Sequence, residues 1–423
     1  MSKILLKNGR IIDPETKRDE VTDILIEDDK ISAIGKIEPE MGMNVIDVTG
    51  KLVIPGVIDL HVHLRDMDQA DKETIETGTR AARNGGITTV FCMPNTSPKL
   101  DCMENIDRYL KLIQDARINV QIVGAITKKL MGEELADIIR YPRFGIKFIT
   151  DDGFDIDDEG LLEKAYEKAK QFDLIVMTHP EIMSIAPNGL INKGKVSEQL
   201  NVEGQPNEKE WKAVERGIRL ALKTGARAHF THLSTKESVD LIRKAKMESA
   251  LITADATPHH ITFTEDEVLV QGSQAKVNPP LRTEEDRLAV IGGLKDGTLD
   301  CIVTDHAPHT AIDKNHDLAS SAFGFSGLEI SVPATITELH FKQGMELVDV
   351  IGLMTIKPAK LANLPVGRLQ TGFQADITVL DIETDEKVST SLFVSKGKNS
   401  PFNGKVLKGW PVMTLVKGMV FEN

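Results

Sequence analysis

The alternation of short apolar runs with longer amphipathic segments is the feature that most constrains this fold. It starts near residue 53, where VIDLHVH is followed by KETIETGTRAARNG and ITTVFCMPN by MENIDRYLKLIQDA. About eight such pairs follow one another over roughly 300 residues, which is the pattern of parallel strands joined by helices. The sequence therefore predicts an α/β fold with a (β/α)8 TIM-like barrel over residues 53–364.

The two ends of the chain have a different texture. KILLKNGRIID and DILIEDDKISAIGK near the start, and ADITVLD and PVMTLVKGMVF near the end, are typical of short strands separated by turns. A chain of 423 residues, 41% of them hydrophobic, is long enough for a large core and a satellite domain. We expect residues 1–52 and 365–423 to pair into one small β-sandwich domain beside the barrel.

Charge and cysteine content disfavour several classes of partner and site. The net charge is −13, which argues against nucleic acid and anionic membranes as partners. The cysteines Cys92, Cys102 and Cys301 form no C-x-x-C pair, so neither a disulfide framework nor a thiolate zinc site is expected. We see no signal peptide and no apolar run of the ~18 residues that a membrane span needs. These features predict a cytoplasmic protein whose metal ligands, if it has them, are His, Asp and Glu.

Side chains that can bind metal stand at the ends of five predicted strands. In a β/α barrel the C-terminal strand ends meet on one face, so these side chains should converge. Side-chain alternation also places the two histidines of VIDLHVH on the same side of their strand. Four imidazoles with two of the three candidate carboxylates would bind two divalent ions rather than one. The candidates are His61, His63, Asp151, Asp152, His179, His232 and Asp305.

Taken singly, such residues have ordinary explanations. A lone His-x-His is more often structural than a ligand pair, and an Asp at a strand end is often a helix N-cap. The coincidence of five strand ends favours a metal site. We interpret His229, His259 and His260 as core or supporting residues, and His316 and His340 as surface residues.

Three further polar residues follow the same strands. Arg65 cannot bind a metal, but its planar guanidinium matches a carboxylate or phosphate, the alternative being a surface ion pair with Asp66 or Asp68. Asn95 and Asn278 suit hydrogen bonding to a polar substrate, although each stands near a proline, where a turn role is a serious alternative.

Motifs along nearly the whole chain resemble those of the dihydroorotases, of the single-function bacterial type, within the amidohydrolase superfamily. They are DLHVHLR, KETIETGT, CMPNTSP, TDDG, THLSTKES, TPHH, NPPLRTEEDR, TDHAPHT, FGFSGLE, MTIKPAK and SKGKNSPFNGKVLKGWPV. TDHAPH alone is typical of the superfamily, whereas the ordered series is specific to dihydroorotases. The resemblance implies a zinc-dependent hydrolase of cyclic amides. Its reaction would be the reversible cyclisation of N-carbamoyl-L-aspartate to (S)-dihydroorotate in pyrimidine biosynthesis.

The resemblance also implies a role for each candidate residue, with two Zn²⁺ per chain. The implied ligands are His61, His63 and Asp305 for the first ion, His179 and His232 for the second, and Asp152 as the bridge. Asp305 would also carry the proton. The implied substrate contacts are Arg65, Asn95 and His309 at a carboxylate, and Asn278, Phe323 and Gly324 at the ring.

Several points remain open in the sequence. A carboxylated Lys147 is the rival of Asp152 as the bridge, and we interpret residues 310–322 as a mobile lid. Relatives usually have Pro-Gly where this chain has Met67 and Asp68, so the loop after Arg65 is expected to be a variant one.

Two other functions compete with the dihydroorotase interpretation. A hydantoinase or allantoinase would share the metal site, but such relatives usually lack an arginine at position 65. A non-catalytic partner of aspartate carbamoyltransferase would have lost its ligands, whereas every expected ligand type is present here. The family also implies a homodimer and an association with aspartate carbamoyltransferase.

Overall fold

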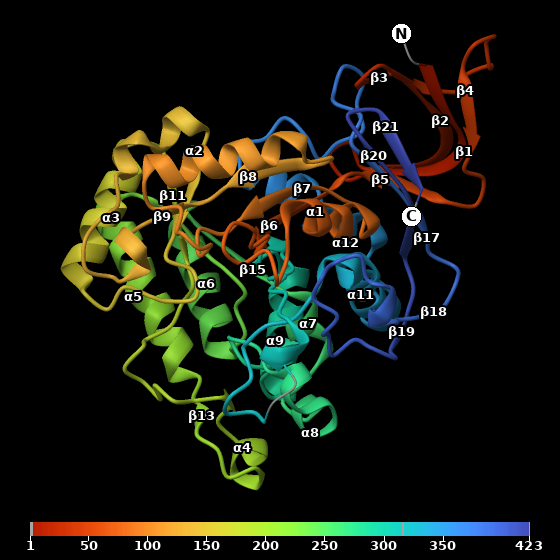
Figure 1. Cartoon of the computed structure of the whole chain (residues 1–423). Coiled ribbons are helices and arrows are strands. Elements are labelled where there is room, and N and C mark those ends of the chain that lie inside the picture. Colours follow the sequence, from red (N-terminus) through yellow and green to blue (C-terminus); the bar gives the residue numbers. More distant parts are fainter. Residues whose placement is uncertain (1–2, 315–316, 423) are drawn as a thin grey trace.

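The computed structural model describes residues 3–314 and 317–422. Figure 1 shows a barrel of strands surrounded by helices, with a separate β layer into which both ends of the chain run. Among the described residues, no helix combines the length and the apolar character that crossing a bilayer requires.

The strands of the barrel are parallel and follow one another in chain order. They are β6 (Val57–Val62), β7 (Ile87–Cys92), β8 (Asn119–Ile122) continuing as β9 (Gly124–Ala125), β10 (Phe148–Thr150), β11 (Ile175–Thr178), β14 (Arg227–Phe230), β15 (Ile252–Ala256) and β16 (Cys301–Ile302). Val62 pairs in parallel with His306, just beyond β16, and the N–H of His63 donates to the His306 carbonyl at 2.9 Å. This contact closes the ring and confirms the predicted (β/α)8 barrel.

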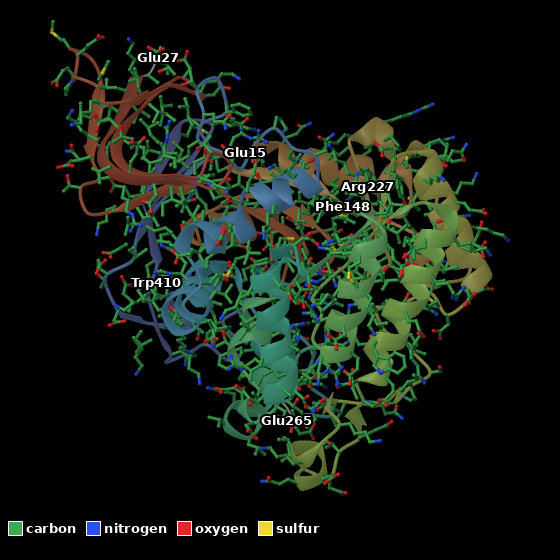
Figure 2. All side chains as sticks on the ribbon, turned by 180° about the vertical axis from the view of Figure 1, so that it is seen from behind. Glu15, Glu27, Phe148, Arg227, Glu265 and Trp410 are labelled. Carbon is green, nitrogen blue, oxygen red and sulfur yellow. The ribbon has the colours of Figure 1, made fainter. Side chains whose placement is uncertain are left out.

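The barrel has a filled interior. Every residue of β6 and β7 is buried, as a sheet covered by helices on one side and packed on the other requires. The rings of Phe91 and Phe148 meet edge to face inside it, with centroids 5.3 Å apart. Figure 2, seen from behind, shows Phe148 beside Arg227, and both align with Ile175 at the N-terminal ends of their strands. The opposite end of the barrel is the end that carries the candidate ligands.

Amphipathic helices cover the barrel, most of them capped by a hydroxyl or carboxyl side chain. Thr74, Asp158, Thr235 and Thr283 each accept the backbone N–H three residues on. The long helices are α1 (Ile75–Asn84), α2 (Met103–Leu112), α3 (Glu159–Gln171), α5 (Glu208–Thr224), α6 (Lys236–Glu248), α9 (Glu284–Asp296) and α12 (Leu347–Met354).

The connections contain shorter elements. They are α4 (Lys195–Gln199), α7 (Pro258–Thr262), α8 (Glu267–Gln271), α10 (Ala311–Lys314), α11 (Ser331–Thr335), a π-helix (Ile336–Lys342), α13 (Ile356–Leu361), and the strand pairs β12 (Ile191–Asn192) with β13 (Gly204–Gln205) and β18 (Glu386–Lys387) with β19 (Val406–Leu407).

One predicted helix is wrong. The apolar run NVQIVGAIT is followed by EELADIIRY, a pattern that predicts an α-helix after the third strand, but the structure has a 3-10 helix there, Ile138–Phe144. Pro142 lies inside the 3-10 helix, and Gly145 ends it with a φ of 73°. Because a proline cannot donate a helical hydrogen bond, an α-helix cannot continue through position 142.

The two ends of the chain share one sheet, as predicted. Its strand order is β21-β20-β17-β5-β1-β2-β3, and β4 pairs with β1 on the side. The N-terminal strands are β1 (Lys3–Asp13), β2 (Arg18–Glu27), β3 (Lys30–Gly35), β4 (Asn44–Asp47) and β5 (Leu52–Pro55), and the C-terminal ones are β17 (Ile377–Asp381), β20 (Trp410–Val416) and β21 (Met419–Glu422). β5 and β17 join the two segments in antiparallel register, and the sheet encloses its own apolar cluster. The domain boundary placed at residue 52 therefore falls inside the span of β5.

Candidate metal centre

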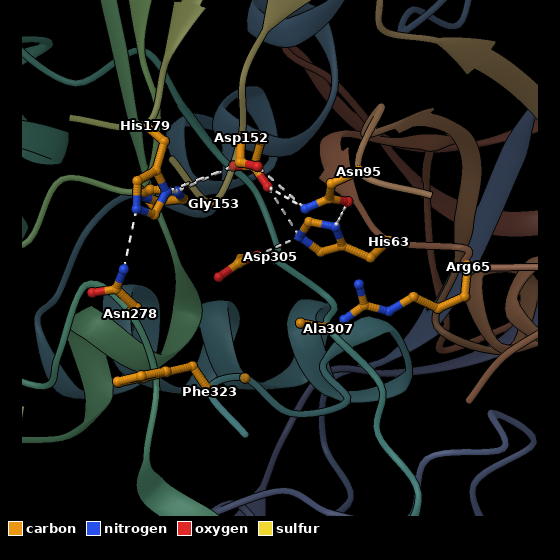
Figure 3. Close-up of a pocket in the computed structure, with 12 residues that line it drawn as sticks. His63, Arg65, Asn95, Asp152, Gly153, His179, Asn278, Asp305, Ala307 and Phe323 are labelled. Atoms are coloured by element: carbon orange, nitrogen blue, oxygen red, sulfur yellow. Dashed lines mark hydrogen bonds and ion pairs between the residues drawn. The ribbon is translucent and has the colours of Figure 1, made fainter. Parts of the chain in front are cut away.

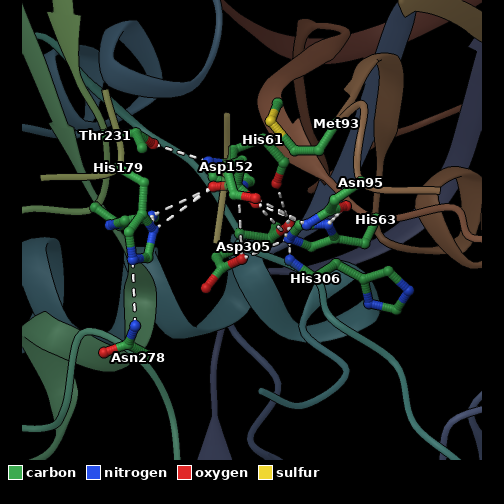
Figure 4. Close-up of polar contacts among 12 residues, drawn as sticks. His61, His63, Met93, Asn95, Asp152, His179, Thr231, Asn278, Asp305 and His306 are labelled. Atoms are coloured by element: carbon green, nitrogen blue, oxygen red, sulfur yellow. Dashed lines mark hydrogen bonds and ion pairs between the residues drawn. The ribbon is translucent and has the colours of Figure 1, made fainter. Parts of the chain in front are cut away.

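β6 delivers the first two histidines. Oδ1 of the buried Asp59 accepts the backbone N–H of His61 at 3.1 Å and so fixes the end of the strand. Nδ1 of His61 lies 2.9 Å from Oγ1 of Thr231, and Nδ1 of His63 lies 2.8 Å from Oδ1 of Asn95. Because each ring is held through Nδ1, both Nε2 atoms are directed at the same interior space (Figure 4).

Asp152, just beyond β10, lies at the centre of the cluster. Its Oδ1 is 3.2 Å from Nε2 of His61, 3.6 Å from Nδ1 of His179 and 3.9 Å from Nε2 of His232. Its Oδ2 is 3.5 Å from Nε2 of His63. One carboxylate therefore faces all four imidazoles, which is the place of a ligand shared between two ions.

The remaining ligand candidates follow β11, β14 and β16. Nδ1 of His179 lies 3.0 Å from Nε2 of His232, and Oδ1 of Asp305 lies 3.1 Å from Nε2 of His63. His232 and Asp305 have φ values of 43° and 48°. Such left-handed conformations cost on the order of 1–3 kcal/mol for non-glycine residues and gather at functional sites.

In this cluster, neighbouring opposite charges shift the pKa values of His61, His179 and the two aspartates more than burial does. Burial lowers the pKa of His61, but Asp152 and Asp305 raise it to about 9, and Asp152 with Glu181 raises the pKa of His179 to about 10. Burial raises the pKa of Asp152 and Asp305, yet the surrounding histidines bring it below the usual range for both. The two carboxylates are thus ionised at neutral pH and draw positive charge into the site.

The donor set fits a pair of divalent cations. Nε2 of His61 and Oδ1 of Asp152 are buried atoms of the cluster without a hydrogen-bond partner among the described residues. The ligand atoms of two groups of side chains lie within 4.8 Å of one another. Ligand atoms of one tetrahedral zinc ion are separated by roughly 3.4 Å, close to the distances found here. The groups are His61, Asp152 and His232, and His61, His63 and Asp305.

The rival bridge, Lys147, lies outside this cluster. It precedes β10, whereas Asp152 follows it, so the two residues stand at opposite ends of the strand. Nζ of Lys147 donates to the carbonyl of Asn363 at 2.9 Å, on the side of the barrel away from the histidines. Lys147 would have to leave this contact and cross the length of the strand to reach a metal ion.

A pocket of about 170 Å³ opens directly over the cluster (Figure 3). It brings together most of the residues predicted for metal and substrate. Its lining consists of His63, Arg65, Asn95, Asp152, Gly153, His179, His232, Asn278, Asp305, Ala307, Phe323 and Gly324. His61 lies deeper and is fully buried.

Arg65 places a buried positive charge in the pocket wall. It is 9% exposed, and its Nε has no hydrogen-bond partner among the described residues. In the part of the chain that the structure describes, no carboxylate forms an ion pair with it. Burial lowers the pKa of Arg65, although Asp305 and Asp152 act against this. A buried guanidinium without a paired anion costs several kcal/mol unless a ligand supplies one.

Hydrogen bonds to the Asp66 carboxylate and from the Asp68 backbone order the loop after Arg65. Arg65, Asp66 and Met67 have φ values of 54°, 58° and 50°, where the usual Pro-Gly turn is missing. The Asp66 carboxylate accepts the N–H of Met67 at 2.6 Å and that of Ile75 at 2.8 Å, at the start of α1. The N–H of Asp68 donates to the carbonyl of Ser97 at 3.0 Å. The Asp66 carboxylate and the backbone of Asp68 thus order the loop that holds Arg65 at the pocket.

The other predicted substrate contacts are placed differently. Nδ2 of Asn95 lies 3.1 Å from Oδ2 of Asp152, so this side chain supports the metal cluster as well as lining the pocket. His309 lies behind the pocket wall, with Nε2 2.8 Å from the carbonyl of Phe323. Gly324, with a φ of 103°, leaves no room for a side chain, because a Cβ would approach that of Ala307 to 2.6 Å. Within the predicted lid 310–322, residues 315 and 316 lie outside the described residues, as therefore does His316.

Sequence reasoning missed two supporting groups. Glu181 contacts His179 with Oε2 3.0 Å from Nε2, and Asp255 accepts from Oγ1 of Thr231 and forms a 2.7 Å pair with Nε2 of His229. Glu181 stands two residues beyond His179, a spacing that can return a side chain to the same face and could have drawn attention to it. No signal in the sequence identified Asp255.

The histidines set aside as supporting residues are buried, as expected. His229 is fully buried, and His259 and His260 pack beside each other with ring centroids 4.4 Å apart. The surface prediction for His340 is only partly right, because this side chain is half-buried and its Nδ1 lies 2.8 Å from the Met345 carbonyl.

Comparison of the sequence with known proteins places the chain in the amidohydrolase family. A profile described as the amidohydrolase family matches residues 52–420. A dihydroorotase of Bacillus cereus (strain B4264) is 42% identical over 417 residues, which cover 98% of this chain and 97% of that protein. A dihydroorotase of Clostridioides difficile (strain 630) is 42% identical over 421 residues, covering 99% and 100%.

Solved structures share the fold. L-hydantoinase (dihydropyrimidinase) from Arthrobacter aurescens superposes with a TM-score of 0.90 at 28% identity, covering 100% of this chain and 96% of that one. Dihydropyrimidinase from Brevibacillus agri gives a TM-score of 0.86 at 22% identity, covering 99% and 94%, and this likeness concerns the fold alone. The sequence relatives are dihydroorotases and the structural neighbours are hydantoinases or dihydropyrimidinases, so the fold by itself does not distinguish between these activities.

Proposed function

This chain belongs to the amidohydrolase family, among its dihydroorotases, and from that premise we propose that it catalyses the reversible cyclisation of N-carbamoyl-L-aspartate to (S)-dihydroorotate and water with two Zn²⁺ per chain. The observation that carries the choice of substrate is Arg65, buried in the pocket without a paired carboxylate among the described residues. Dihydroorotate carries a carboxylate beside its ring amide, and this anion would complete the site.

Two groups of converging side chains support the choice of metal ligands, and His179 adds a nitrogen 3.6 Å from Oδ1 of Asp152. His61, His63 and Asp305 would hold one ion, His179 and His232 the other, and Asp152 would bridge them. When bound, such ions lower the pKa of water and polarise a carbonyl oxygen. Nε2 of His61 and Oδ1 of Asp152, which are buried without a hydrogen-bond partner among the described residues, support this assignment.

Asp305 is suited to move the proton. It lines the pocket, and the neighbouring histidines keep its pKa below the usual range, so its carboxylate is ionised and able to accept. In ring opening Asp305 takes a proton from the attacking water and delivers it to the ring nitrogen as the C–N bond breaks. In ring closure the nitrogen gives the proton back to Asp305, which passes it to the departing oxygen.

The substrate would lie between the metal cluster and the pocket wall. Arg65 and Asn95 would bind its carboxylate, and Asn278 with the Phe323–Gly324 backbone would contact the ring. His309 would act through the wall, because its imidazole contacts the Phe323 carbonyl.

A hydantoinase activity is the second candidate, and the likeness to the Arthrobacter aurescens enzyme favours it. Hydantoin has no carboxylate, so its binding would leave Arg65 buried and unpaired. An unpaired buried charge is costly, and this argues for the anionic substrate. A homodimer, an association with aspartate carbamoyltransferase and a cytoplasmic location remain proposals from the family.

The direct test assays dihydroorotate, hydantoin and allantoin on one zinc-supplemented preparation of the wild-type protein and of Arg65→Ala. We expect dihydroorotate turnover by the wild type, a large rise in its KM in Arg65→Ala, and little turnover of the neutral rings. Faster turnover of hydantoin than of dihydroorotate by the wild type would contradict the proposal.

A further inference from the structure

Glu181 is a buried carboxylate at the edge of the catalytic pocket. It is 7% exposed, and three donors surround it. Its Oε2 lies 3.0 Å from Nε2 of His179 and 2.9 Å from Nδ2 of Asn278, while its Oε1 lies 2.8 Å from Nζ of Lys209. Lys209 is buried too and donates to the Ile185 carbonyl at 2.8 Å. Glu181 thus touches one predicted metal ligand and one predicted substrate contact.

The Glu181 carboxylate determines which atoms of His179 and Asn278 carry hydrogen. Beside the Lys209 ammonium Glu181 is ionised, and an ionised carboxylate can only accept. His179 must therefore hold its proton on Nε2, and Asn278 must turn its NH2 group toward Glu181. Nε2 of His179 and Nδ2 of Asn278 are 3.2 Å apart. Both are donors, so they converge on the same oxygen rather than bond to each other.

These hydrogen positions also determine which atoms His179 and Asn278 present on the side away from Glu181. In the neutral form of His179 that binds a metal ion, this leaves the lone pair on Nδ1, which lies 3.6 Å from Oδ1 of Asp152 and 3.0 Å from Nε2 of His232. A neutral imidazole binds a metal ion through such a lone pair, and a carboxylate on its other nitrogen fixes the tautomer and ring orientation. The amide oxygen of Asn278 points away from His179 (Figure 3).

We propose that Glu181 is a positioning residue that fixes the metal-binding nitrogen of His179 and the orientation of Asn278 at the same time. Lys209 keeps the Glu181 carboxylate charged and in place. The inference rests on the proposed function, in which His179 binds the second cation and Asn278 contacts the ring. It predicts that metal binding and substrate binding weaken together when this one carboxylate is changed.

Glu181→Gln is the sharpest variant, because it keeps the size of the side chain and replaces one acceptor by a donor. If the new amide oxygen faces His179 and Asn278, the new NH2 group opposes the Lys209 ammonium. If the amide turns over, both contacts at the pocket are lost. Neither orientation reproduces the three hydrogen bonds of the carboxylate.

The experiment measures Zn²⁺ affinity by competition with a chromophoric chelator, together with the KM for dihydroorotate. We expect Glu181→Gln to weaken Zn²⁺ binding about 10–100-fold, as loss of such supporting carboxylates does. Its KM should rise to near that of Asn278→Ala, and the double variant should show no further rise, since both changes disable the same contact. Lys209→Met, which keeps the Glu181 carboxylate, should have an intermediate effect.

Glu167→Gln is the matched control, with the same charge change at an exposed position of α3. It should leave both constants unchanged. A lower melting temperature of Glu181→Gln with unchanged Zn²⁺ affinity and KM would reduce Glu181 to a structural role and overturn the inference. Failure of the wild type to turn over dihydroorotate would instead refute the proposed function, while the Zn²⁺ measurement would still report on Glu181.

Discussion

Oδ1 of Asp152 lies 3.2 Å from Nε2 of His61, and the same carboxylate reaches the other three imidazoles of the site through its two oxygens. No other described carboxylate has this position. It makes Asp152 the geometric centre of the cluster and gives the first prediction.

Asp152→Asn should reduce the zinc content from two ions per chain to one or fewer, because a neutral amide is a poor bridge between two cations. Turnover should fall at least about 100-fold. Metal analysis after zinc supplementation and gel filtration measures the first effect. Lys147→Met is the control and should keep both ions, whereas loss of metal in that variant alone would make Lys147 the bridge.

Asp305→Ala tests the proton carrier. Loss of general acid–base catalysis should lower kcat by about 10²–10⁴-fold, with the larger part of the bound metal retained through the histidines. Steady-state kinetics in both directions, beside metal analysis, measures the two effects. Retained turnover in a metal-loaded Asp305→Ala protein would exclude Asp305 from this role.

Arg65→Gln should act on substrate recognition. A hydrogen bond to a charged group contributes about 1.5–3 kcal/mol, so kcat/KM for dihydroorotate should fall roughly 10–150-fold. Any residual activity on a neutral ring such as hydantoin should be unaffected, since no carboxylate is involved. Equal losses on both substrates would show that Arg65 supports the fold of its loop rather than the bound anion.

Metal removal should lower stability. The cluster holds two ionised carboxylates in a buried space, and bound cations stabilise only the folded state. Free Zn²⁺ at a hundred times its dissociation constant adds about 2.7 kcal/mol per site. Thermal unfolding with and without a chelator checks this, and an unchanged melting temperature would contradict a preformed zinc site.

His259 should make stability depend on pH. Burial lowers its pKa to about 3, below the ordinary value of about 6.5 in the unfolded chain. Between these values the unfolded state binds a proton that the folded state does not, so stability is retained above pH 6.5 and lost as pH falls below it. From pH 8 to pH 5 the metal-free wild type should lose about 2 kcal/mol more than His259→Leu. Urea unfolding with chelator present measures both, and parallel pH profiles would refute the prediction.

The order of strands and helices could be predicted because the spacing of apolar residues along the chain indicates each element locally. Mostly apolar, buried runs such as that of β6, followed by amphipathic helices, specify parallel strands covered on both faces. The ligand candidates could be found because each stands at or just beyond the end of its strand. Over EELADIIRY the apolar pattern predicts an α-helix, but the structure forms only a 3-10 helix from Ile138, and Pro142 directly after the segment prevents its continuation as an α-helix.

What the sequence by itself determined is the order of strands and helices and which candidate ligands stand at the strand ends. Tertiary structure decided which of them meet. Asp152 and Lys147 belong to one run, and only their places at opposite ends of β10 separate them. The role proposed for Glu181 became visible only in the structure, where Lys209 of α5 and Asn278 donate to its carboxylate. Such contacts join residues about 30 to 100 positions apart, and they exist only once the strand ends of the closed barrel lie side by side.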